Sequence, residues 1–159
     1  MAQKATRREE EKQTLQKFIE NQGEEFYPDL VSYLRIQEPC DVLYKEIEYQ
    51  ITYGDQKLIG EMRQKTAKKK DNLLGEIFCT IRDISDTYAE TLIHGALENK
   101  KNKSSDKMIL LIHCSFPGIY APIEAREEKL KKYFTEHQDL GSKWQHIFIV
   151  FPDGNIKLR

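Results

Sequence analysis

The spacing of apolar positions changes along the chain, and each spacing predicts an element. Up to Asn21 the chain is polar apart from Leu15, Phe18 and Ile19, which predicts a helix with a narrow apolar stripe that ends near Gly23. The following segment FYPDLVSYLRI (26–36) fits a short helix opened by Pro28, and its part VSYLRI also fits a strand. We favour the short helix, followed by an extended stretch at 35–37.

Strand-like patterns occupy the next region. Residues 40–44 and 47–53 read as the two strands of a hairpin, with Gly54 at its exit. Alternation places Ile47, Tyr49, Ile51 and Tyr53 on one face, and the polar residues Glu48, Gln50 and Thr52 on the other. A hairpin with a solvated polar face is one interpretation of this pattern, and a polar site built on that face is the other.

The second half of the chain alternates helical and strand patterns. Helices are predicted over 82–99 and 123–137, and strands over MILLIHCSF (108–116), WQHIFIVF (144–151) and the last residues after Gly154. The order is α-β-β-β-α-β-α-β, so we expect an α/β fold in which helices flank a mixed sheet. With 159 residues, no internal repeat and no composition break, we expect a single domain over 1–159.

The turn of the hairpin decides whether its acidic residues meet. A two-residue turn at Lys45-Glu46 would put Asp41 opposite Gln50 and diagonal to Glu48, within reach of one shared cation. Neither turn residue is the Gly or Asn that such a turn prefers, so a connection of three or four residues is the alternative. That alternative would scatter the carboxylates, because a shift of one residue reverses the faces.

An Asp that follows a proline-containing dipeptide, then Glu-x-Gln on the next strand, resembles the PD-(D/E)XK nuclease superfamily. Here the motif reads Pro39-Cys40-Asp41 and Glu48-Tyr49-Gln50. The resemblance covers most of the chain in element order and implies a restriction-endonuclease-like domain. It also implies a metal-dependent nuclease that hydrolyses phosphodiester bonds of DNA, with Asp41, Glu48 and Gln50 as catalytic residues.

In that superfamily the acidic pair and a backbone carbonyl bind Mg²⁺, which Mn²⁺ can replace. Carried over, the metal ligands are Asp41, Glu48 and the carbonyl of Tyr49. The chain departs from the pattern at Cys40, which separates the proline from the Asp, and at Gln50, where the family usually has Lys. Glutamine is neutral and can only orient a water molecule by hydrogen bonds. Lys45 and Lys57 are candidates for a displaced ammonium, and Glu20, Glu24 and Glu25 for an acid on the first helix.

Charge gives a second candidate feature. The net charge is −1, so binding of a polyanion would depend on a local patch. The segment from 57 to 71 contains six basic residues and only two acidic ones, so we expect it to bind nucleic acid. The residues assigned to that role are Arg63, Lys65, Lys68, Lys69 and Lys70.

Hydropathy, the N-terminal sequence and the cysteines indicate in which compartment the protein is found. No apolar run reaches the roughly 18 residues of a membrane span. The polar N-terminus and three widely spaced cysteines favour a cytoplasmic protein. We expect the protein not to contact a membrane and to bind DNA. We expect its sequence specificity to come from a homodimer or from a protein partner. A nuclease fold that has lost catalysis and serves as a nucleic-acid-binding or protein-interaction module is the alternative function.

Overall fold

The computed structural model describes residues 2–33, 41–54, 89–103, 105–114, 122–141 and 143–159. Within these ranges the strands form one six-stranded sheet with the order β1-β2-β3-β4-β5-β6. β2 (Val42–Tyr44) is antiparallel to both of its neighbours, β1 (Val31–Ser32) and β3 (Ile47–Tyr53). β4 (Met108–His113) and β5 (His146–Phe151) run parallel to β3, and β6 (Gly154–Lys157) is antiparallel to β5. The predicted α/β class with a mixed sheet is therefore confirmed.

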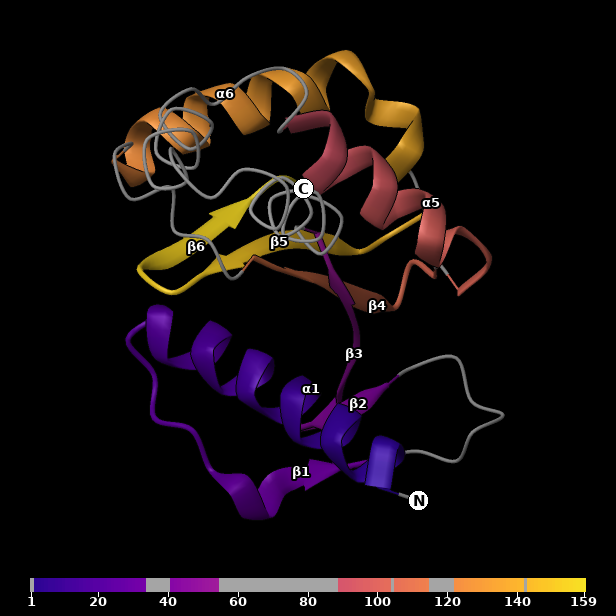
Figure 1. The fold of residues 1–159 in the computed structure, drawn as a ribbon, viewed down its shortest axis with the longest axis vertical. Coiled ribbons are helices and arrows are strands. Elements are labelled where there is room, and N and C mark those ends of the chain that lie inside the picture. The colour runs from indigo at the N-terminus through magenta and orange to yellow at the C-terminus, as the bar shows by residue number, and fades with distance from the viewer. Residues whose placement is uncertain (1, 34–40, 55–88, 104, 115–121, 142) are drawn as a thin grey trace, which may run out of the picture.

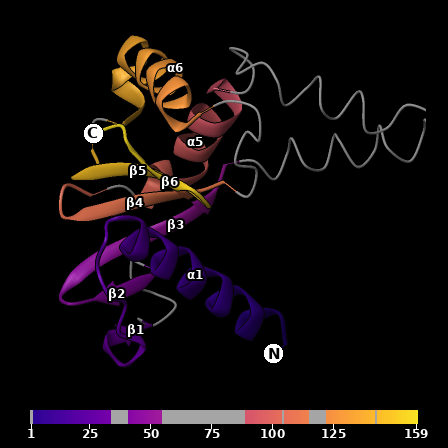
Figure 2. The same cartoon turned by 90° about the vertical axis from the view of Figure 1, so that its left-hand side faces the viewer.

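Helices cover both faces of the sheet (Figures 1 and 2). The long helix α1 (Ala2–Asn21) lies on one face, where its predicted stripe of Leu15, Phe18 and Ile19 is buried. It packs against alternate residues of the strands, among them Val42, Tyr49, Ile51, Ile109, Leu111 and Val150. The rings of Phe18 and Phe148 meet edge to face at 4.8 Å between centroids, which fixes α1 over the middle of the sheet.

The opposite face is covered by two helices from the second half of the chain. From Ala89, the first described residue of this region, the chain is helical through the π-helical turn η2 (Thr91–Gly95) into α5 (Ala96–Lys100) and the short 3₁₀ turn η3 (Lys101–Lys103). α6 (Ile123–Glu136) follows β4 and leads into the 3₁₀ turn η4 (Gln138–Gly141). These helices share a core with the other alternate strand residues, namely Met108, Leu110, Ile112, Ile147, Ile149, Phe151 and Ile156.

The first half of the chain differs from the expectation at one point. After α1, Gly23 adopts the positive φ (79°) that stops the helix, as expected of a glycine there. Pro28 does open a helical turn, but η1 (Pro28–Leu30) is a single 3₁₀ turn and the chain enters β1 directly at Val31. The strand interpretation of this segment is therefore the better one over its first residues. The expected extended stretch at 35–37 lies outside the described residues.

The hairpin that carries the candidate site forms with the two-residue turn. Val42 pairs with Tyr49, Leu43 with Glu48, and Tyr44 with Ile47. Lys45 and Glu46 both have positive φ, 48° and 65°, which is the geometry of a type I′ turn. The ammonium of Lys45 lies 5.1 Å from the ring centroid of Tyr27 and 5.5 Å from that of Tyr44. These cation–π contacts offset part of the backbone cost of the turn.

Candidate functional site

Asp41 immediately precedes β2, and its carboxylate is tied to the neighbouring strand. Its backbone N–H donates to the carbonyl of Tyr49 at 3.0 Å, and its Oδ2 accepts the backbone N–H of Ile51 at 3.0 Å. Backbone and side chain thus extend the β2–β3 ladder beyond its last regular pair. These two hydrogen bonds leave Asp41 little freedom to reorient. A metal ligand or a catalytic group needs such a fixed orientation.

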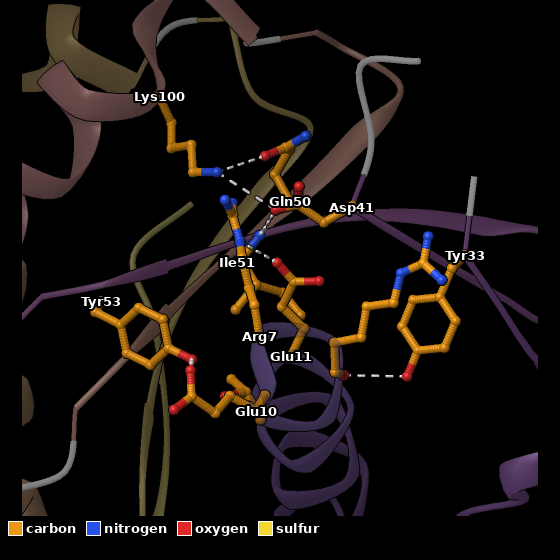
Figure 3. Close-up of polar contacts among 11 residues, drawn as sticks. Arg7, Glu10, Glu11, Tyr33, Asp41, Gln50, Ile51, Tyr53 and Lys100 are labelled. Atoms are coloured by element: carbon orange, nitrogen blue, oxygen red, sulfur yellow. Dashed lines mark hydrogen bonds and ion pairs between the residues drawn. The ribbon is translucent and has the colours of Figure 1, made fainter. Parts of the chain in front are cut away.

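A lysine from the other half of the chain completes this group (Figure 3). The Nζ of Lys100, the last residue of α5, donates to Gln50 Oε1 at 3.0 Å and lies 3.4 Å from Asp41 Oδ2. Figure 3 shows Lys100 descending from its helix to meet Asp41 and Gln50 at the sheet. The ammonium therefore joins two of the three residues that the sequence assigned to catalysis.

The three side chains of this cluster are enclosed. Gln50 is fully buried, and the side chains of Lys100 and Asp41 are 10% and 12% exposed. Burial lowers the pKa of the Lys100 ammonium, and the negative charge of Asp41 acts in the opposite direction. In such a low-dielectric setting, charges act on one another more strongly than at a surface. We refer to Asp41, Gln50 and Lys100 as the lysine cluster.

Burial of Gln50 corrects one interpretation of the hairpin. The face that carries Glu48, Gln50 and Thr52 is not a solvated outer face, because Gln50 and Thr52 are 0% and 7% exposed. Gln50 pairs with Leu110 of β4, whose face of the sheet is covered by α5. A polar side chain in that position needs a partner, and Lys100 supplies it.

Glu48, the second predicted acid, lies two residues before Gln50 on the same face of β3. It is half-buried between Leu43 on β2 and Met108 on β4. Within the described residues its carboxylate makes no hydrogen bond or ion pair. Its joint use with Asp41 as a pair of metal ligands stays a prediction.

Helix α1 brings an unpredicted acid to the other side of Asp41. Glu11 is 5% exposed, and the Nε of Arg7 donates to its Oε1 at 2.9 Å. Burial raises the pKa of Glu11, and the charge of Asp41 raises it further. The first-helix candidates from the sequence, Glu20, Glu24 and Glu25, are instead exposed residues at the far end of that helix and just beyond it. Glu11 has the helical spacing of Leu15 and Phe18, four and seven residues on, and that spacing was the available signal.

A second polar group fixes α1 to the ends of β3 and β4. The hydroxyl of Tyr53 donates to Glu10 Oε2 at 3.1 Å, and the hydroxyl of Thr14 lies 3.3 Å from His113 Nδ1. Thr14 donates its single proton to the carbonyl of Glu10 at 3.0 Å. These contacts hold α1 against the C-terminal ends of β3 and β4.

Several predicted residues lie outside the described residues. These are the five assigned to nucleic acid, Arg63, Lys65, Lys68, Lys69 and Lys70, together with Lys57 and Cys40. Lys45, the other candidate for a displaced ammonium, is at the hairpin turn, where it packs on tyrosine rings. Lys100 was not among the candidates, because its place in the site follows from packing of α5 and not from a sequence motif.

Two findings concern the wider setting. In the part of the chain that the structure describes, no helix is both long and apolar enough to cross a bilayer. No protein-family model, curated protein or solved structure matches this chain. The site must therefore be interpreted from its own chemistry.

Proposed function

We propose that the chain is a metal-dependent nuclease that hydrolyses phosphodiester bonds of DNA at the lysine cluster. The observation that carries this proposal is the contact of Lys100 Nζ with both Gln50 Oε1 and Asp41 Oδ2. Gln50 stands where the resembled superfamily usually has Lys, and the contact brings an ammonium to that position from α5. The departure in the motif is thereby compensated by a residue 50 positions further along the chain.

The element order supports a restriction-endonuclease-like arrangement as part of the same proposal. Three antiparallel strands are followed by β4 parallel to β3, with α1 on one face and α5 on the other. The candidate site lies at the start of β2 and the middle of β3, where the superfamily motif places its acids. Strand order alone does not establish function, so the weight of the proposal rests on the cluster.

The donor set suits a small divalent cation in its chemistry. Carboxylate oxygens of Asp41 and Glu48 and the carbonyl of Tyr49 are hard ligands of the kind that Mg²⁺ prefers, with remaining positions filled by water and substrate phosphate. Among the described residues no group of three or more His, Cys, Asp or Glu side chains is arranged to hold a metal. The protein would therefore supply two carboxylates and one carbonyl. When bound, Mg²⁺ or Mn²⁺ would activate water and stabilise negative charge on the scissile phosphate.

Asp41, Lys100 and Gln50 would each have a separate role in the reaction. Asp41 is held in place by its bonds to Tyr49 and Ile51, so its orientation is set before a ligand arrives. Lys100 would stabilise charge that develops on the phosphate, as a positioned cation in an enclosed site. Gln50 would hold the ammonium of Lys100 through its Oε1.

Cleavage assays test the proposal directly. The purified chain is incubated with supercoiled plasmid and with linear duplex DNA in the presence of Mg²⁺ or Mn²⁺. We expect cleavage that Asp41→Asn abolishes and that Lys100→Met slows by about a hundredfold, the usual scale for loss of one electrostatic stabiliser. Lys103→Met is the matched control, because it removes an exposed positive charge from η3 without touching Asp41 or Gln50.

A binding or assembly module is the second candidate. The observation in its favour is that Asp41 Oδ2 already accepts from Ile51 and Lys100, a satisfied arrangement that needs no metal. DNA binding by the wild type without cleavage in either cation would support it. Cleavage that persists undiminished in Asp41→Asn would contradict the assignment of the nuclease site.

A further inference from the structure

Arg7 is an exposed arginine that a buried carboxylate holds in place. Its Nε donates to Glu11 Oε1 at 2.9 Å, while its side chain is 61% exposed and that of Glu11 only 7%. Arginine and glutamate four residues apart on a helix commonly pair loosely at the surface. Here one partner is fixed by burial, so the guanidinium is anchored at one end.

The other end of that guanidinium remains available. Glu11 occupies the Nε, and within the described residues no group accepts a hydrogen bond from either terminal nitrogen. The terminal nitrogens of an arginine carry a planar fork of donors that matches the oxygens of a phosphate. An arginine whose stem is already ordered loses less side-chain entropy on binding than a mobile one.

The position of Arg7 relates this fork to the lysine cluster. Its charge interacts with that of Asp41 and with that of Lys100, from the opposite side to α5. In Figure 3 its side chain rises from α1 toward Asp41 and Lys100. A nucleic-acid strand with one phosphate at the cluster would therefore meet an exposed cation on the α1 side.

We propose that Arg7 binds a backbone phosphate of the nucleic acid beside the one held at the lysine cluster, with Glu11 as its positioning residue. This inference rests on the proposed function, since it assumes a phosphodiester substrate. It assigns a phosphate contact to α1, whereas the basic residues 63–70 were the only ones that the sequence pattern selected. Because phosphate contacts carry no base information, the contact would bind DNA of any sequence.

Arg8 provides the matched control. It carries the same charge at the next position of α1, but its guanidinium lies 5.3 Å from the ring centroid of Tyr33, and its carbonyl accepts the hydroxyl of that tyrosine at 3.1 Å. One residue along a helix turns the side chain by about 100°. Arg8→Gln therefore removes the same net charge from a different side of the helix.

Binding of a fluorescein-labelled DNA duplex, measured by anisotropy in EDTA over a range of NaCl concentrations, separates the two arginines. Arg7→Gln keeps a donor for Glu11, and we expect it to weaken binding about fivefold to tenfold and to lower the slope of log Kd against log salt by about one. Arg8→Gln should leave the slope unchanged. If Arg7→Gln fails to fold, Arg7→Lys retains the charge without the fork, and we expect weaker binding with an unchanged slope.

The outcomes are distinct. Equal effects of Arg7→Gln and Arg8→Gln on affinity and slope would overturn the Arg7 contact, because they would indicate a diffuse charge effect. If the wild type also cleaves DNA in that case, the nuclease proposal stands and only this inference falls. A wild type that neither binds nor cleaves DNA would remove both.

Discussion

Lys100 Nζ lies 3.0 Å from Gln50 Oε1, although 50 residues separate these two positions in the sequence. The contact exists because α5 covers the face of β3 that carries Gln50, and because Lys100 is the last residue of that helix. It places a positive charge beside Asp41 in an enclosed setting. Each consequence of this arrangement for binding or stability can be measured.

The first prediction concerns competition for Asp41. The ammonium of Lys100 lies 3.4 Å from the carboxylate that a divalent cation would use. Charges at about 4 Å interact by a few kcal/mol even at an effective dielectric constant near 20, so removal of the lysine should strengthen cation binding by about tenfold or more. We expect Lys100→Met to bind Mn²⁺ and Ca²⁺ more tightly than the wild type in isothermal titration calorimetry.

Lys103→Met is again the control for that measurement. Lys103 is exposed, so solvent screens its charge, and its removal should change cation affinity far less. Equal gains in the two variants would mean that only net charge matters. Unchanged or weaker binding in Lys100→Met would indicate that Asp41 is not a cation ligand.

The second prediction concerns the pH dependence of stability through Glu11. Burial and the charge of Asp41 raise its pKa in the folded protein above the ordinary value. The folded state then holds the proton where the unfolded chain has lost it, so this residue makes the protein less stable as pH rises through that window. Glu11→Gln removes the effect because glutamine does not titrate.

Urea unfolding of the wild type and Glu11→Gln at several pH values between 7 and the ordinary glutamate pKa measures this contribution. The free energy of unfolding of the variant minus that of the wild type should decrease as pH falls, because the wild type regains the cost of its buried charge. A difference that stays constant or grows on acidification would refute this interpretation.

The hairpin illustrates what the sequence could and could not predict. Alternation located both strands correctly, and the register follows from the turn. The two-residue turn could not be predicted from residue preferences. Lys45 and Glu46 both adopt the positive φ of this turn, although Gly or Asn is usual there. Lys45 also lies over the ring of Tyr27, the residue just before η1, and no pattern within the hairpin could reveal that contact.

The candidate site was predictable only in its local part. Asp41 and Gln50 were chosen from a motif and a face of one strand, and their neighbourhood on the sheet follows from the register. Lys100 and Glu11 come from helices on opposite faces of the sheet. Their place beside Asp41 depends on how each helix packs, and a single sequence carries no direct signal of such tertiary contacts.

The third prediction concerns a buried arginine on the far side of the molecule from α1. Arg126 of α6 is 1% exposed. Its guanidinium donates hydrogen bonds to both carboxylate oxygens of Asp153 and lies 4.5 Å from the ring centroid of Phe151. Removing the negative charge that faces a buried guanidinium is costly. We expect Asp153→Asn to lower the free energy of unfolding by about 2–3 kcal/mol, discounted from the cost of a fully buried pair because Asp153 is half exposed.

Glu127→Gln offers the comparison for that prediction. Glu127 pairs with Lys131 on the same helix, but both of these side chains are about half exposed, so neither charge is buried. Such pairs contribute about 0.3–0.5 kcal/mol. Chemical denaturation of both variants should therefore give clearly different losses. Similar small losses would show that Arg126 does not depend on Asp153.

The last prediction compares two glycines, one packed against the helical stretch that ends in α5 and one within that stretch with open space beside it. A Cβ at Gly54, just after β3, would lie 2.8 Å from Ile112 Cγ2 and 2.8 Å from Leu92 Cδ2, and 3.3 Å from the carbonyl oxygen of Leu92. The glycine thus allows the end of β3 to approach the helical stretch that carries Lys100. We expect Gly54→Ala to lower the free energy of unfolding by about 1–3 kcal/mol, because the core must shift to admit a methyl group.

Gly95 is the opposite case in the same helical stretch. A Cβ there meets nothing within 4 Å, and its backbone is helical, with φ −60° and ψ −42°. Alanine should therefore stabilise the protein by up to about 1 kcal/mol through helix propensity. Thermal and urea unfolding of the two alanine variants compares the same substitution in both settings. Tolerance of Gly54→Ala would mean that the helical stretch does not pack on the end of β3 as described, and the contact between Lys100 and Gln50 would then lose its support. Destabilisation by Gly95→Ala would mean that the space around residue 95 is not open.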